Sequence, residues 1–95
     1  MHVTLRWYME GSALGDAMEK NVPEIKKLIT DVPGFIAYYA FRNGNSVTSV
    51  TVCQDKAGTD ETTRRAAAWV KDNVDASKIK PPAINEGDTF VQFNK

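Results

Sequence analysis

The stretch Phe35-Ile36-Ala37-Tyr38-Tyr39-Ala40-Phe41 is apolar or aromatic at every position. Side chains alternate across a β-strand, so a strand here would present apolar groups on both of its faces. The odd-numbered residues would line one face and the even-numbered residues the other. Helices of this short chain can cover only one side of a sheet. We therefore expect a second copy of the chain to cover the other side.

The composition describes one small domain that spans residues 1–95. The 12 basic and 12 acidic residues cancel and are mixed along the chain, which argues against a nucleic-acid or anionic-membrane partner. No apolar run approaches the ~20 residues that cross a bilayer. Cys53 is the only cysteine, which excludes an intrachain disulfide, and no basic and apolar leader precedes the first strand pattern. We expect a soluble protein of the cytoplasm.

The N-terminal half changes from a strand pattern to a helix pattern and back. Residues 2–9 alternate and predict a strand. Residues 14–32 carry apolar side chains at intervals of three and four, which predicts an amphipathic helix with Ser12 as its N-cap. Pro23 does not interrupt the apolar rhythm, so we expect one kinked helix. The apolar strand 35–41 follows directly.

The C-terminal half begins with a strong turn signal. Asn43-Gly44-Asn45 predicts a tight hairpin, and residues 46–54 predict the strand after it. A second helix is expected from Thr59 to about Asn73, and a last strand at residues 89–93. Gly87 is expected to mark a bulge or a close approach of two backbones.

This order of strand, helix, strand, strand, helix and strand predicts an α+β fold of the ferredoxin-like type. Its four-stranded antiparallel sheet would carry both helices on one face and leave the other face open. Burial of apolar surface contributes about 25 cal/mol per Å², and large exposed apolar patches are unusual on monomers. We therefore expect a twofold homodimer in which sheet packs against sheet.

Four segments carry a resemblance to a known family. They are Leu5-Arg6-Trp7-Tyr8-Met9-Glu10-Gly11, Val32-Pro33-Gly34-Phe35-Ile36-Ala37-Tyr38-Tyr39, Ser49-Val50-Thr51-Val52 and Arg65-Ala66-Ala67-Ala68-Trp69-Val70. Over nearly its whole length the chain resembles the antibiotic biosynthesis monooxygenase-like family of dimeric α+β barrels. The resemblance implies a homodimer with a small pocket between sheet and helices in each protomer. Some relatives are cofactor-independent monooxygenases of aromatic polyketides, some degrade haem, and many have no established activity.

One departure from that family bears on the chemistry. Haem-degrading relatives combine an asparagine on the first strand with a tryptophan and a histidine from the helical layer. This chain has no histidine after His2, and the position of Trp69 is not matched to the family's tryptophan. We therefore do not expect haem cleavage, and we expect no bound cofactor.

Four residues form the candidate ligand pocket. Arg6 and Tyr8 share one face of the first strand, and Trp69 and Asn73 lie four apart on the second helix. If these faces meet, the pocket could hold an aromatic, acidic or quinone-like ligand by stacking and hydrogen bonding. The alternative is that Trp69 is core and that Arg6 and Tyr8 belong to the dimer face or an exposed edge.

The remaining reactive residues have simpler interpretations. His2 is expected to be an ordinary terminal side chain, because a chain end rarely holds a general base in place. Cys53 has no CxxC partner or nearby histidine and is expected to be a structural thiol. One histidine and one cysteine do not make a metal site. Arg42, Arg64 and Arg65 are expected to be solvated.

Two classes of function remain, and no catalytic residue can be assigned. The first is a non-catalytic dimeric barrel that binds a small molecule. The second is a cofactor-independent monooxygenase that orients an aromatic or quinone-like substrate toward dioxygen, which requires binding, orientation and proton transfer. A ligand-sized cavity reached by both Tyr8 and Trp69 would favour the enzyme.

Overall fold

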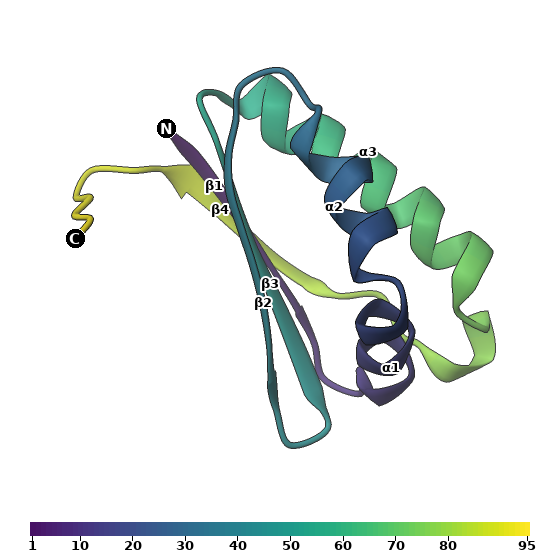
Figure 1. Ribbon diagram of the computed structural model, residues 1–95. Coiled ribbons are helices and arrows are strands. Elements are labelled where there is room, and N and C mark those ends of the chain that lie inside the picture. Colours follow the sequence, from purple (N-terminus) through teal and green to yellow (C-terminus); the bar gives the residue numbers. More distant parts are fainter.

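The computed structural model describes residues 1–95 as an antiparallel four-stranded sheet with helices on one face (Figure 1). The elements are β1 (His2–Tyr8), α1 (Ser12–Lys20), α2 (Val22–Thr30), β2 (Phe35–Asn43), β3 (Ser46–Cys53), α3 (Lys56–Asn73), a 3₁₀ turn (Ala76–Lys78) and β4 (Ala83–Asp88). The strand order is β2-β3-β1-β4, so β2 and β4 are the edges. This confirms the predicted ferredoxin-like α+β fold. None of the helices has an apolar stretch long enough to span a bilayer.

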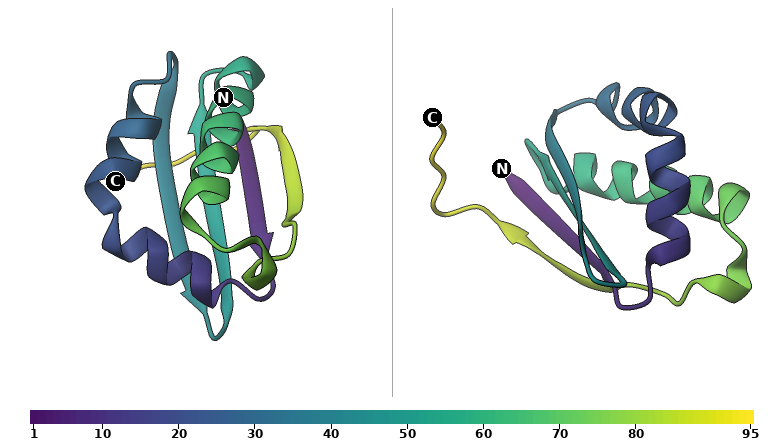
Figure 2. Two further views of the ribbon diagram at one scale, coloured as in Figure 1. Left: turned by 90° about the vertical axis from the view of Figure 1, so that its right-hand side faces the viewer. Right: turned by 60° about the horizontal axis from the view of Figure 1, so that its bottom comes forward.

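The first helical segment is broken at Asn21, so the prediction of a single kinked helix was wrong. Pro23 lies in the first turn of α2, where its missing N–H costs no hydrogen bond within the helix. The Asn21 side chain donates to the carbonyl oxygen of Ala17 at 2.7 Å, and the chain changes direction there (Figure 2). The N-cap of α1 is Gly11 rather than Ser12.

Strand β2 is apolar on both faces, as predicted, but its alternation is interrupted. The register against β3 shifts between Phe35 and Ala37, which is a β-bulge. Because of this extra residue, Phe35 and Tyr38 both pack against the core on the helix side. The expectation that Phe35 shares a face with Tyr39 was therefore wrong. Tyr39 and Phe41, 64% and 54% exposed, lie on the open face.

Helix α3 begins earlier than the sequence pattern suggests. Asp55 is its N-cap and accepts a hydrogen bond from the backbone N–H of Gly58 at 3.1 Å. The predicted start at Thr59 was wrong, because Asp55 caps the helix four residues before Thr59. The predicted end at Asn73 is confirmed.

The last strand was also misplaced by the sequence pattern. Strand β4 covers Ala83–Asp88, whereas residues 89–93 form no strand. The backbone N–H of Thr89 still donates to the carbonyl oxygen of Met1 at 2.8 Å, and the chain then leaves the sheet toward its C-terminus (Figure 1). Gly87 pairs with Val3 in an unbroken register and has open space where a Cβ would lie. The expected bulge or close approach at Gly87 is therefore absent. Polar residues suit β4 because it is an exposed edge strand.

The hydrophobic core lies between the sheet and the helices. Its fully buried members are Leu14, Ile25, Ile29, Val47, Trp69 and Val74. Cys53 is also fully buried, and burial raises the pKa of its thiol. The prediction of a structural thiol is confirmed. Trp7, on the open face of β1 between β3 and β4, stays 39% exposed.

Candidate functional site

Strand β1 directs its even-numbered side chains toward the helices. Arg6 lies opposite Ser49 of β3 in the pairing register and is only 5% exposed. Tyr8 is half-buried and packs against the hydrophobic core. Arg6 and Tyr8 therefore lie inside the protomer, and the alternative that put them on the dimer face or an exposed edge was wrong.

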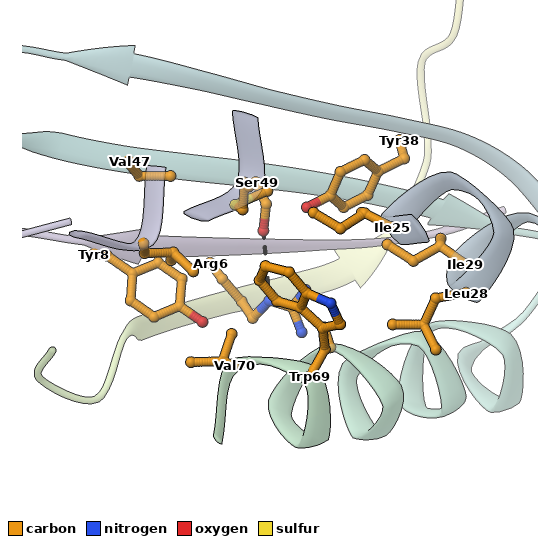
Figure 3. Close-up of a pocket in the computed structure, with 13 residues that line it drawn as sticks. Arg6, Tyr8, Ile25, Leu28, Ile29, Tyr38, Val47, Ser49, Trp69 and Val70 are labelled. Carbon is orange, nitrogen blue, oxygen red and sulfur yellow. Dashed lines mark hydrogen bonds between the residues drawn. The ribbon is translucent and has the colours of Figure 1, made fainter. Parts of the chain in front are cut away.

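Three of the four candidate residues line one small cavity, here called the inner cavity (Figure 3). Arg6 and Tyr8 come from β1 and Trp69 from α3, while Ser49 of β3 and Tyr38 of β2 complete its polar lining. Aliphatic side chains from α1, α2 and α3, together with Val47 of β3, form the rest of its wall. About 30 Å³ is open to the centres of water-sized spheres, which is room for a water molecule or two but not for an aromatic ring.

Asn73 does not reach the inner cavity, so that part of the pocket prediction was wrong. Its side chain is exposed at the end of α3 and donates to the carbonyl oxygen of Trp69 at 2.8 Å. Four helical residues turn slightly more than one full revolution, which carries Asn73 from the buried stripe toward solvent. The side-chain amide then bonds the backbone of its own helix.

A larger space, here called the outer groove, adjoins the inner cavity between the N-terminal helices and β2. It holds about 490 Å³, and its lining includes Glu19, Lys26 and Phe35. Four side chains line both spaces: Met18, Ile25, Ile29 and Tyr38. The inner cavity and the outer groove therefore share part of their walls.

Sequence reasoning missed Tyr38 and Ser49 as cavity residues. Tyr38 lies on the even-numbered face of the apolar strand, and that strand was interpreted only as a dimer contact. Ser49 lies between Val47 and Thr51 on the helix-facing side of β3, where a small polar residue gave no distinct signal. Ser49 lies in the site because it is opposite Arg6 in the pairing of β1 with β3.

The charge of Arg6 has no acidic partner in the structure. Its Nε donates to the Ser49 hydroxyl over 3.4 Å and the phenol of Tyr38 also lies against the guanidinium, but no carboxylate lies within ion-pair distance. The indole N–H of Trp69 is also buried without an acceptor. Burying an unpaired charge and an unpaired donor is unfavourable. The inner cavity therefore offers hydrogen-bond donors that lack acceptors.

The two tyrosines of the inner cavity are neutral groups. Burial raises the pKa of Tyr8, and the nearby positive charge of Arg6 only partly opposes this effect. Burial likewise raises the pKa of Tyr38 against the opposing effects of Arg6 and Ser49. Both phenols stay protonated at neutral pH. Arg6 is therefore the only charged group that lines the inner cavity.

His2 is an ordered, buried residue, so its interpretation as an ordinary terminal side chain was wrong. Strand β4 pairs with β1 and brings two carboxylates to the imidazole, Glu86 at 2.9 Å from Nε2 and Asp88 at 3.1 Å from Nδ1. The hydrogen bond to Glu86, followed by that to Asp88, raises the pKa of His2. His2 does not line the inner cavity and serves to join the two strands.

The three arginines outside the cavity differ in exposure. Arg64 is exposed, as predicted. Arg42 pairs with two carboxylates of α1, the nearer being Asp16 at 2.9 Å. Arg65 is largely buried and donates to the carbonyl oxygen of Leu28 at 3.0 Å, near the end of α2. The expectation that Arg65 is solvated was therefore wrong, because it ties α3 to α2.

No protein-family profile and no curated protein matches the sequence. Solved structures do match the fold over nearly the whole chain. A monooxygenase from the ActVA-Orf6 gene of Streptomyces coelicolor, in complex with nanaomycin D, superposes with a TM-score of 0.71 at 12% identity over 99% of this chain and 91% of that one. The chain has the fold of the antibiotic biosynthesis monooxygenase-like proteins.

Two further solved structures have the same fold. A putative antibiotic biosynthesis monooxygenase from Bordetella bronchiseptica gives a TM-score of 0.69 at 12% identity, covering 95% of this chain and 97% of that one. The haem-degrading protein MhuD from Mycobacterium tuberculosis, with two haems bound in its active site, gives a TM-score of 0.68 at 12% identity. That match covers 99% of this chain and 100% of MhuD. The resemblance in the sequence is thus confirmed at the level of the fold.

Proposed function

We propose that the chain is a cytoplasmic homodimer that binds a small molecule in the inner cavity and the adjoining outer groove. One observation carries this proposal: Arg6 holds a buried positive charge among apolar walls with no acidic partner. Proteins rarely bury an unpaired charge unless it serves a function. The inner cavity alone is too small for a ligand. A ligand would therefore extend into the outer groove and displace the shared side chains.

A cavity-filling variant tests where the ligand binds. Ala66 lines the inner cavity, so Ala66→Leu should fill it, whereas Ala67→Leu adds the same side chain at an exposed position of the same helix. Both changes are nearly neutral for helix propensity. Aromatic acids and quinones would be titrated while the ¹⁵N-labelled indole N–H resonance of Trp69 is followed. We expect Ala66→Leu to weaken binding at least tenfold and Ala67→Leu to leave it unchanged.

Equal affinity in Ala66→Leu and wild type would show that the ligand does not use the inner cavity. That result would remove the main support for a binding function. Trp7, the second tryptophan, lies on the open face and acts as an internal control in every titration.

The homodimer is supported by the open face of the sheet. Trp7, Tyr39 and Phe41 expose aromatic surface there, and the helices cover only the opposite face (Figure 2). An aromatic patch of this kind marks an interaction surface more often than a solvated one. A second copy of the same sheet is a matching partner under twofold symmetry.

Charge on the open face should separate the two protomers. Light scattering at micromolar concentration should give twice the chain mass of 10.5 kDa for the wild type. Phe41→Glu should give 10.5 kDa, because it would bury a carboxylate without a partner in the interface. Ala67→Glu, on the exposed side of α3, should stay dimeric. A wild-type protein that scatters as a single chain would contradict the homodimer.

The second candidate function is a cofactor-independent monooxygenase. Its support is the fold shared with proteins named as monooxygenases, together with a buried cation that could stabilise an enolate or phenolate oxygen. Oxidation of an anthrone would convert its methylene group to a carbonyl. One atom of dioxygen enters the product, and the other leaves as water with the two methylene hydrogens. Because Tyr8 and Tyr38 stay protonated, the substrate would have to ionise with help from Arg6 alone.

Oxygen uptake would test this second function. An anthrone and hydroquinone panel would be supplied to wild type and to Trp69→Phe, which keeps an aromatic ring but removes the indole N–H. Enzyme-dependent uptake that falls at least tenfold in Trp69→Phe would support the monooxygenase. If neither protein consumes oxygen above the rate in buffer, the simple binding function is preferred.

A further inference from the structure

The inner cavity and the outer groove differ in character, and this difference indicates the kind of ligand. Arg6 lines the inner cavity but not the outer groove. We propose that the ligand is an amphipathic carboxylate whose charged head pairs with Arg6 and whose planar apolar body lies in the outer groove against Tyr38. This inference rests on the binding function proposed above and specifies its ligand class.

The size and charge of the inner cavity match a carboxylate head. The hydrogen bond from Nε to Ser49 leaves the terminal nitrogens of the Arg6 guanidinium, which lie beside the Tyr38 phenol, to donate to a carboxylate. The open space of about 30 Å³ suits a group of a few atoms. A single cation among neutral tyrosines and aliphatic walls balances one negative charge. A doubly charged phosphate would leave one charge unpaired.

The outer groove matches an apolar body that carries no charge. Seven of its ten lining residues are hydrophobic, so most of its wall offers no polar partner. Phe35 and Tyr38 present aromatic rings, which favour a flat ring system by stacking. Glu19 and Lys26 line the groove with opposite charges and do not select the sign of a ligand. The charge of Arg6 is therefore what would select an anionic ligand.

The shared side chains give the head a route to Arg6. Met18 and Tyr38 line both spaces and can change rotamer, and methionine adapts readily to altered surroundings. Figure 3 shows Tyr38 beside Ile25 and Ile29 at one end of the inner cavity, with Arg6 next to the indole ring of Trp69. A head that passes Tyr38 would thus reach the guanidinium and the unpaired indole N–H.

A matched pair of probes separates the charge from the aromatic body. 2-Naphthoate and 2-naphthamide have the same ring system, but only the first is charged. Each would be titrated into the ¹⁵N-labelled wild-type protein while both indole N–H resonances are followed, assigned with Trp7→Phe. We expect 2-naphthoate to shift the Trp69 resonance and to bind at least about tenfold more tightly than 2-naphthamide, since a charge-assisted hydrogen bond is lost with the amide.

The variant Arg6→Met completes the test, with Arg64→Met as the exposed control. Arg6→Met should reduce the preference for 2-naphthoate over 2-naphthamide to about one, and Arg64→Met should leave it unchanged. Equal binding of the two probes at Trp69 in the wild type would overturn the carboxylate inference and leave the binding function intact. Shifts at Trp7 alone, or no shift with either probe, would overturn both. The comparison of probes in the wild type does not depend on how well any variant folds.

Discussion

Arg6→Met is expected to stabilise the unliganded protein, by about 1 kcal/mol or more in the free energy of unfolding. Arg6 is 5% exposed and has no ion-pair partner, so folding removes its charge from water without an opposite charge in return. Methionine has an unbranched side chain of similar length that fits among the aliphatic walls of the inner cavity. Replacing a buried charge by a well-packed apolar residue is often neutral or stabilising.

Urea unfolding would measure this change, with both proteins at one fixed concentration because any self-association makes stability depend on concentration. Arg64→Met is the matched control: Arg64 is exposed and pairs only with Glu61, so its loss should change the free energy of unfolding by less than about 0.5 kcal/mol. Destabilisation of Arg6→Met by 1 kcal/mol or more would identify Arg6 as a structural residue and argue against its role in binding.

If Arg6→Met is more stable than the wild type and no longer prefers an anionic ligand, then Arg6 lowers the stability of the protein and is needed for binding. Natural proteins break local folding rules mainly where function requires it. The inner cavity breaks two such rules, with a lone buried charge and a buried indole N–H that has no acceptor. The core around it consists of buried hydrophobic side chains packed against one another.

The fold could be predicted because its buried elements carry clear periodicity. The alternation in β1 and the two-sided β2 gave the sheet, and the turn at Gly44, with φ of +60°, gave the hairpin. The failures fall where that signal is weak or ambiguous. Strand β4 is exposed throughout and Ile84 is its one large apolar residue, so it has no alternating apolar pattern to detect. Pro23 suits either a kink within a helix or the first turn of a new one, and only the path of the chain decides.

The site was predictable only in part, because a sequence gives the face of an element but not what packs against it. Arg6, Tyr8 and Trp69 were expected to form a pocket only if their two faces meet; they do line one cavity, and Trp69 is also part of the core, as the alternative had it. The partners of His2 lie on β4, the strand that was misplaced, so they could not be foreseen. The bulge in β2 likewise altered which side chains face the helices.

The last prediction concerns the close contact between α3 and β3. Gly58→Ala is expected to destabilise the protein by about 1–2 kcal/mol and to lower Tm by about 5 °C or more. A Cβ at Gly58 would lie 2.8 Å from the Cβ of Cys53 and 3.3 Å from the carbonyl oxygen of Pro33. Cys53 is fixed in a central strand, so the helix itself would have to move. The gain in helix propensity of up to about 1 kcal/mol offsets only part of this cost.

Gly15→Ala separates crowding from propensity, because Gly15 is also helical and buried. There the three atoms nearest to a Cβ all belong to the guanidinium of Arg42, at 2.6–2.8 Å, and that long side chain can swing aside. Its exposed ion pairs with α1 contribute little, so the gain in helix propensity should remain, and we expect Gly15→Ala to stabilise the protein by up to about 1 kcal/mol. Thermal unfolding of both variants at equal concentration makes the comparison. If Gly58→Ala were as stable as Gly15→Ala, the backbone of α3 would not be held against β3, and the wall of the inner cavity that carries Trp69 would be free to move.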